Sequence, residues 1–367
     1  MIKSAAVPAL DFTLGVGPAD NCPGRGVGVR AVALAYLEPA PVLLADEYGG
    51  RHFDPDDGNN IGVANGYADV TAPLGKVCLG IFYRTDYRGE ASNDALDALE
   101  ANHAKRPFDV GRNYALAVDS IYQEAAGIKL SRVFDFEPSA GWSTRLGITA
   151  SLMKAITHRE ERLRGSATAT SGSYALGTAT LVRTLSDYRL KRFNPFVEKK
   201  DPEGYGWSTD LSLRVRSPAG HVLELTAMDA FSRIDWGDVP QSLETIDNQT
   251  IRYDANFNRE AFVSGLDRRV SVEQVIEPRY RVAFSAPIKG DVMIVVSDDL
   301  VHQTHFPALG VSYRRIDRHA EVSLDAQTGA LSLVGGRGAF RASITTNDLD
   351  LQEASVLGVE LSFFKRW

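Results

Sequence analysis

The sequence contains no long apolar run. Its longest uncharged stretch, Gly165 to Val182, consists mostly of Ser, Thr, Gly and Ala, whereas a helix that spans a bilayer needs about 20 consecutive, mainly apolar residues. Helical membrane spans are therefore excluded. Linkers, composition shifts and low-complexity tracts are also missing, so nothing divides the chain into separate domains. We expect residues 1–367 to form a single domain.

The sequence also lacks the motifs of common chemistry. It has no G-x-S-x-G elbow, phosphate loop or dinucleotide fingerprint. One cluster would suit an active site on a rim, namely Asp298 and Asp299 with His302 and His305, but loop histidines are the simpler interpretation. The formal net charge of −7 argues against a nucleic-acid partner, which would need a basic face. We expect neither enzymatic activity nor nucleic-acid binding.

Cysteines are few, and no leader is recognisable. Cys22 and Cys78 have no framework of further cysteines around them, so their spacing leaves open whether they pair in an oxidising compartment. Met1, Ile2 and Lys3 are not followed by a long apolar run or a small-residue cleavage site. The economical interpretation is a mature, exported sequence with an added Met.

What the chain does contain is strict two-residue alternation. In the segment from Gly206 to Arg216, apolar or large residues alternate with polar ones that would be unsuited to a dry core. The polar positions are Ser208, Asp210, Ser212, Arg214 and Arg216. Similar alternation recurs near residues 76–84, 142–152, 280–286, 309–314 and 320–325. A tilted strand needs about 9 to 11 residues to cross the hydrocarbon layer. Several of these segments are long enough.

Aromatic residues mark the ends of these segments. Trp142, Trp207 and Tyr280 open theirs, while Tyr83, Tyr313 and Trp367 close theirs. Rings with one polar edge are typical of the interface between lipid and water. Because lipid offers no hydrogen-bond partner to the backbone, a sheet in a membrane must close on itself, with an apolar outside and a polar lumen.

The last strand carries the most specific signal. Leu357, Val359, Leu361, Phe363 and Trp367 fall on one side of an extended chain, and Gly358, Glu360, Ser362 and Arg366 fall on the other. This tail resembles the carboxyl-terminal signature of bacterial outer-membrane β-barrels, an aromatic last residue preceded by alternating apolar positions. Lys365 departs from the pattern. The resemblance implies residence in the outer membrane of a Gram-negative cell envelope, contact with its lipid, and recognition of this strand by the barrel-assembly machinery.

We therefore predict an all-β fold, a transmembrane antiparallel up-and-down β-barrel of about 16 strands with a range of about 14 to 18. Short turns at 217–220 and 325–329 are expected to face the periplasm. The polar stretches 88–112, 157–164, 192–205 and 235–258 are expected to be extracellular loops. A soluble β-sandwich or propeller, with the same apolar faces in a dry core, is the alternative fold.

One helix is expected at residues 92–103. Ser92 can cap it, Asp94 makes its first turn acidic, and Leu96 and Leu99 share one face. Such a helix either folds into the lumen as a constriction or stays in a solvated loop.

Charged residues on the polar faces suggest what passes through. The expected lumen-lining residues are Lys76, Arg84, Arg145, Asp210, Arg214, Arg216, Arg281, Arg314 and Glu321. An excess of arginine favours anions, so we predict a channel or transporter for small polar or anionic solutes, or for an exported polymer. Alternatively, the charges pair across the lumen and brace a plugged structural barrel that binds a partner through its loops.

Two further expectations concern a metal and an oligomer. Asp54, Asp56 and Asn60 alternate around a glycine as oxygen ligands of calcium often do, although the remainder of an EF-hand loop is missing. No other cofactor is expected. The small residues Ala31, Ala33 and Ala35 suit a flat interface between copies, but Val32 and Leu34 leave open which side of that strand faces lipid, so oligomerisation stays open.

Overall fold

We describe a computed structural model of the chain. It covers residues 26–38, 42, 58–103, 106–171, 174–187, 202–253, 259–315 and 317–365. Within these ranges the protein contains sixteen strands and one helix, α1 Asn93–His103. The first eight strands are β1 Val27–Leu37, β2 Asn59–Leu74, β3 Val77–Ser92, β4 Asn113–Phe136, β5 Ser143–Ser171, β6 Tyr174–Leu185, β7 Glu203–Arg216 and β8 Val222–Tyr253. The others are β9 Arg259–Gln274, β10 Arg279–Lys289, β11 Val292–Val301, β12 Thr304–Arg315, β13 Arg318–Asp325, β14 Leu331–Arg337, β15 Phe340–Thr346 and β16 Val356–Lys365.

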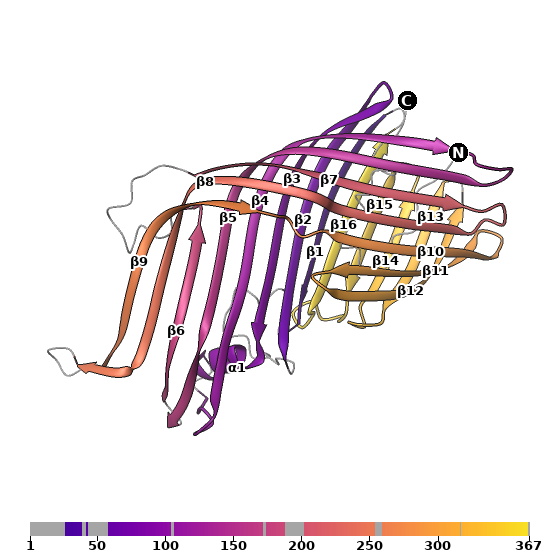
Figure 1. The fold of residues 1–367 in the computed structure, drawn as a ribbon. Helices are drawn as coiled ribbons and strands as arrows, with labels where there is room; N and C mark the ends of the chain where they lie inside the picture. The colour runs from indigo at the N-terminus through magenta and orange to yellow at the C-terminus, as the bar shows by residue number, and fades with distance from the viewer. Residues whose placement is uncertain are drawn as a thin grey trace.

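The strands close into one antiparallel barrel (Figure 1). Strands β10 to β16 and β1 to β5 follow one another as neighbours, and the first strand pairs with the last through residues such as Ala31 and Leu361. Strand β7 joins β5 to β8, and β8 joins β10, which completes the ring. Each strand of the ring pairs with a neighbour on both sides, as a sheet in lipid requires.

Two positions in the wall are each shared by two strands. Residues 159–171 of β5 pair with β6, and residues 143–155 of β5 pair with β7. Likewise, residues 241–247 of β8 pair with β6, and residues 222–237 of β8 pair with β7. On the other side of β8, β9 and β10 also divide one position. Sixteen strands therefore occupy fourteen wall positions. The predicted number of sixteen agrees with the number of strands but not with the fourteen positions of the closed ring. The two numbers differ because a wall strand that is interrupted by a loop appears in the sequence as two strands.

The outer wall is apolar and ends in aromatic rings. Leu79, Ile81, Leu130 and Leu152 are among its exposed aliphatic residues. The expected girdle residues that the structure describes all lie outside and are about two-fifths exposed, namely Tyr83, Trp142, Trp207, Tyr280 and Tyr313. Within the described residues, no helix is long and apolar enough to cross a membrane.

The terminal strand has the expected orientation. Val359, Leu361 and Phe363 are exposed on the outer face of β16, and Leu357, half-buried, shares their side. Glu360 and its inward neighbours are buried. Trp367 lies outside the described residues.

Antiparallel order places alternate turns at opposite ends. The turns at 75–76, 217–221 and 338–339 share one end, which we call the inner end. The turn at 326–330 lies at the opposite, outer end, as do α1 and the turn at 302–303. The expectation that 325–329 belongs with 217–220 is therefore wrong. A short turn alone does not identify an end, since both ends of the β11 to β14 sector have short turns.

Several strands continue past the outer rim. Residues 157–164 and much of 235–258, expected to be loops, belong to the long strands β5 and β8, which continue with β4, β6 and β9 as a projecting sheet (Figure 1). In this region charged residues such as Glu161, Arg162 and Arg164 do not alternate regularly with apolar ones, because both faces of the projecting sheet meet water. That mixed polarity made the segments look like loops in the sequence.

Helix α1 sits at the outer tip of this sheet and contacts β3 and β4 (Figure 1). The Ser92 hydroxyl accepts the Ala95 N–H at 3.2 Å, which is the expected cap. Asp94 accepts the Ala115 N–H at 2.9 Å and pairs with Arg112 at 2.7 Å. These bonds lower the pKa of Asp94 from its ordinary value, the Ala115 N–H having the largest effect. The helix is thus fastened to the projecting sheet and does not enter the lumen.

The orientation of β1 is now defined. Val32 and Leu34 point inward, whereas Ala31 and Ala33 are on the outer wall. Across the pairing with β2, Ala31 faces Ala68 and Ala33 faces Gly66. The outer wall is therefore smooth here, and oligomerisation through it stays a prediction.

Candidate functional site

The inward faces of the strands carry many buried polar side chains, together with a cluster of buried apolar ones that includes Leu34, Tyr36 and Phe306. On β7 every inward residue from Ser208 to Arg214 is buried, as the alternation indicated. Of the residues expected to line the lumen, Arg84, Asp210, Arg214, Arg281 and Glu321 are buried inside the barrel. Arg314 also points inward near the inner end of β12.

The remaining expected lumen residues lie at or beyond the inner end. Arg145 pairs with the exposed Asp135 at 2.8 Å, and Arg216 is the exposed last residue of β7. Lys76 does not line the lumen: it is exposed in the two-residue turn between β2 and β3. The sequence pattern placed the start of β3 one residue too early. The strand begins at Val77, and Lys76 belongs to the two-residue turn before it.

The buried cationic side chains of the interior, arginine and lysine, lie next to buried carboxylates. Arg214 pairs with Glu224, and Lys129 pairs with Asp69 and also donates to the Tyr67 hydroxyl at 3.1 Å. Glu360 lies between Arg30 at 3.7 Å and Arg341 at 3.9 Å. These buried acids follow the same alternation as the arginines, and counting them from the sequence would have removed the apparent excess of positive charge.

One set of polar side chains crosses the lumen, and we call it the crossbar: Asn65, Arg84, Asp86, Asp229 and Arg279. Arg84 donates to both carboxylate oxygens of Asp229 at 2.8 Å and to Asp86 at 2.7 Å. Arg279 donates to Asp229 at 3.2 Å and to Asn65 at 2.8 Å, and lies 3.4 Å from Asp86. All five side chains are buried or nearly so.

The crossbar joins opposite walls. Asn65 is on β2 and Arg279 on β10, and five wall positions lie between these strands by the shorter way round the barrel. Figure 1 shows β8, β10 and β11 running across the view while β2 to β5 run steeply past them. Direct hydrogen bonds between such distant strands mean that the two walls meet in the middle of the lumen.

A bulge in β8 places the central carboxylate. Thr209 of β7 pairs with Phe231 and Leu211 pairs with Ala227, so a single β7 residue, Asp210, faces three residues of β8. Asp229, in the middle of these three, has a left-handed φ of 54°, which aspartate tolerates better than most residues. Its N–H donates to the Asp210 carboxylate at 2.9 Å. Bulges commonly redirect side chains, and simple alternation could not have found this one.

Further contacts between distant strands also cross the lumen. Gln274 of β9 donates to Gln123 of β4 at 2.5 Å, and Gln123 donates to Asp86 at 3.1 Å. Tyr36 of β1 meets the fully buried Phe306 of β12 edge to face, with 5.3 Å between ring centroids. The interior thus contains both an ionic and an apolar contact between walls.

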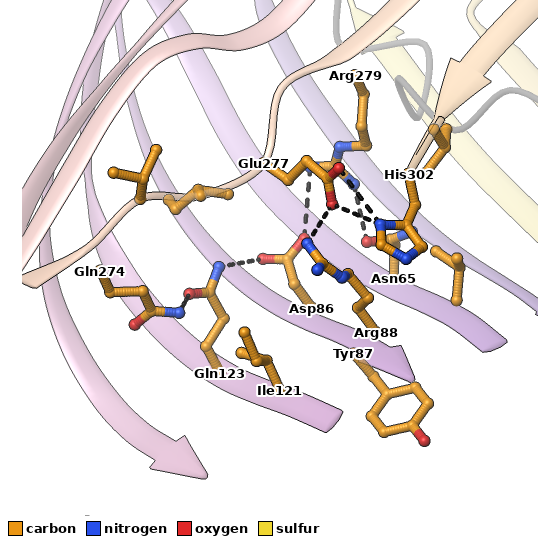
Figure 2. A pocket seen from close by; sticks show the side chains of 14 residues that line it. Asn65, Asp86, Tyr87, Arg88, Ile121, Gln123, Gln274, Glu277, Arg279 and His302 are labelled. Atoms are coloured by element: carbon orange, nitrogen blue, oxygen red, sulfur yellow. Dashed lines mark hydrogen bonds and ion pairs between the residues drawn. The ribbon is translucent and has the colours of Figure 1, made fainter. Parts of the chain in front are cut away.

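A small cavity of about 70 Å³ lies between the crossbar and the outer mouth (Figure 2). We call it the outer pocket. Its aliphatic side chains come from Val63, Ile121, Val275, Ile276 and Val301. Its polar side chains come from Asn65, Asp86, Arg88, Gln123, Gln274, Glu277, Arg279 and His302, with Tyr87 at the edge.

The rim of the outer pocket is built around Glu277, in the linker between β9 and β10. Arg88 donates to it at 2.6 Å, and His302 Nδ1 lies 3.2 Å away (Figure 2). Burial raises the pKa of Glu277, but the bonds from His302 and the charge of Arg88 more than offset this, so the pKa lies below its ordinary value. The other His302 nitrogen lies 3.5 Å from Glu90.

The expected rim cluster is divided in the structure. His305 pairs with Asp298 at 2.7 Å on the outer face, whereas Asp299 is buried inside and His302 belongs to the pocket rim. Neighbouring strand residues point to opposite faces, so sequence proximity did not bring these groups together.

The metal and disulfide expectations rest partly on residues outside the description. Asp54 and Asp56 are among these, while Asn60 is buried in β2. Within the described ranges, no three His, Cys, Asp or Glu residues are placed to hold a metal ion. Calcium binding stays a prediction. Cys78 is buried and disulfide-bonded, and Cys22 lies outside the described residues.

The closed antiparallel ring, its even number of wall positions, the apolar outer face between aromatic girdles and the polar interior together define the class. The protein has the fold of a bacterial outer-membrane β-barrel. No protein-family model and no curated protein matches the chain.

Similar solved structures include outer-membrane proteins of several kinds. A deltaS2S3 mutant of the monoaromatic hydrocarbon channel TodX is 10% identical, with 97% of this chain and 94% of that chain covered and a TM-score of 0.49. The Ralstonia pickettii toluene transporter TbuX is 8% identical, with 99% and 96% covered and a TM-score of 0.29. The Escherichia coli outer-membrane protease OmpT is 11% identical, with 93% and 94% covered and a TM-score of 0.23.

Proposed function

We propose that this barrel is a gated channel, closed here by the crossbar, which passes small uncharged polar solutes when the crossbar opens. The observation that carries the proposal is the nature of the closure: Arg84, Asp229 and Arg279 meet through side chains in mid-lumen. A closure of this kind can separate without breaking any backbone pairing of the wall.

The energetics of buried ion pairs support a gate. Desolvation of two charges largely offsets their attraction, so a buried pair contributes little net stability relative to the separated, hydrated groups. When Arg84 and Asp229 separate, water entering the lumen solvates both. The apolar contact of Tyr36 with Phe306 has no such compensation, so the ionic part of the closure is the part suited to open and close.

The matched charges support a proposal for the class of solute. The expectation of anion preference depended on an excess of arginine in the lumen. Because the interior cations face Asp69, Asp86, Glu224, Asp229 and Glu360, the passage offers opposite charges in comparable number. Such a passage favours polar solutes without net charge over anions.

Liposome swelling tests the proposal. Wild-type protein should admit arabinose slowly, and Asp229→Asn should admit it much faster because Arg84 and Arg279 lose their shared carboxylate. Asp135→Asn makes the same change in an exposed pair at the inner end and should leave swelling unchanged. Equal swelling rates for wild type and Asp229→Asn, in vesicles shown to contain folded protein, would reject the gate.

A second candidate function rests on the projecting sheet. Strands β4, β5, β6, β8 and β9 extend past the outer rim and carry α1 (Figure 1). A barrel whose main role is to present this sheet to a partner would stay closed. Absence of swelling in both wild type and Asp229→Asn, with a normal folded state, would favour this function.

A further inference from the structure

Two buried donors in the outer pocket lack partners. Within the described part of the chain, neither Asn65 Nδ2 nor Arg279 Nε has a hydrogen-bond partner. Both side chains line the pocket, and both residues are at least nine-tenths buried. The orientation of the Asn65 amide follows from its neighbour, because its Oδ1 accepts from Arg279 Nη1 at 2.8 Å. Leaving a buried donor unmatched costs about 1 to 3 kcal/mol, so this site is suited to an acceptor atom.

The rest of the pocket surrounds these donors with aliphatic side chains. Val63, Ile121, Ile276 and Val301 lie around the same cavity. A pocket with a mostly apolar lining and a few polar groups is the usual form of a small-molecule site. The aliphatic groups favour a compact hydrocarbon body, and the two N–H donors favour one oxygen on that body.

Charge around the pocket narrows the class further. The cations Arg88 and Arg279 are matched by Glu277 and Asp86, at 2.6 Å and 3.4 Å respectively. A carboxylate ligand would have to displace one of these acids, and an ammonium ligand would meet only donors at Asn65. We propose that the outer pocket binds small uncharged amphiphiles whose carbonyl or hydroxyl oxygen accepts hydrogen bonds from Asn65 and Arg279.

The site shares a residue with the gate. Arg279 belongs both to the outer pocket and to the crossbar, where it donates to Asp229. A ligand oxygen on Arg279 Nε holds the same guanidinium whose Nη2 donates to Asp229, so we expect occupancy of the pocket to change the closed-to-open ratio of the gate. This coupling depends on the proposed function, whereas binding itself does not, so the two are tested separately.

Saturation-transfer NMR on the full chain in lipid nanodiscs tests binding, with signals from empty nanodiscs subtracted. Cyclopentanone should receive saturation from the wild-type protein, and the transferred signal should reach a plateau as the ketone concentration is raised into the millimolar range. Methylcyclopentane, which lacks the acceptor, should bind at least tenfold more weakly. This comparison needs no variant, so it is independent of folding defects.

Two variants locate the site. Asn65→Asp keeps an acceptor for Arg279 but removes the Nδ2 donor, and it should weaken cyclopentanone binding at least tenfold. Ser323→Ala removes a buried hydroxyl that does not line the pocket and should leave binding unchanged. Equal binding of the ketone and the hydrocarbon, no transfer to the ketone, or unchanged affinity in folded Asn65→Asp would overturn the proposal. Binding that persists while Asp229→Asn fails to swell vesicles would reject the gate and keep the pocket.

Discussion

The pair of Arg84 and Asp229 should show strong energetic coupling. Their two bonds are 2.8 Å long, and their side chains are 3% and 0% exposed. Removing one partner of a buried pair typically costs about 3 to 5 kcal/mol, because the other charge is left without compensation. Each residue here keeps one other partner, Asp86 or Arg279, so we expect the lower end, about 3 kcal/mol, for Asp229→Asn and for Arg84→Met.

The double variant should cost about 4 kcal/mol instead of the roughly 6 kcal/mol sum of the two single ones, since it leaves neither charge orphaned. We expect a coupling energy of about 2 kcal/mol, within the range found for residues in one network. The assay is equilibrium urea unfolding in lipid vesicles, followed by tryptophan fluorescence for all four proteins. Additive costs, or singles that cost under about 0.5 kcal/mol, as surface substitutions do, would refute the description of this pair as a buried junction.

Three other predictions follow from separate parts of the barrel. Because the pKa of Asp94 is lowered in the folded protein, the bond that its carboxylate accepts from Ala115 of β4 should hold α1 to the sheet above the ordinary carboxyl pKa and be lost as pH falls through the lowered value. The protection factor of the Ala115 amide, which is its exchange rate relative to the intrinsic rate at the same pH, should therefore fall as pH is lowered from about 5 to about 2, and Asp94→Asn should abolish that pH dependence. Phe306→Ala should lower stability by about 3 to 5 kcal/mol through an interior cavity, seen as a lower urea midpoint; an unchanged midpoint would contradict the wall-to-wall contact. Leu361→Arg on the lipid face should cost about 2 to 4 kcal/mol and slow insertion, whereas Leu349→Arg, 95% exposed at the outer end, should insert normally in the same gel-mobility assay.

The sequence predicted the wall well because the alternation has a period of two and each face meets one solvent. Leu361, Trp207 and Tyr280 lie outside and Asp210 and Arg214 lie inside for that reason. The cap of α1 by Ser92 was also readable, because capping is a local interaction.

The centre of the site was not readable in the same way. Asp229 reaches the lumen through a bulge, which shifts the alternation of β8 locally. The contacts of Arg279 with Asn65 and Asp229 join strands far apart in sequence, and no local pattern specifies which distant side chains meet. Lys76 was misplaced because one residue decides whether a strand has ended.

Single-channel recording in a planar bilayer tests the central claim, that the crossbar is a gate, most directly. Wild-type protein should be closed for most of the record, with brief openings. Asp229→Asn should be open for most of it, since about 3 kcal/mol corresponds to roughly a hundredfold change in the closed-to-open ratio. Adding Arg84→Met to Asp229→Asn should lengthen the closures again, because the double variant leaves neither partner of this pair orphaned. A wild-type channel that conducts steadily, or an inserted Asp229→Asn protein that stays silent, would contradict the account.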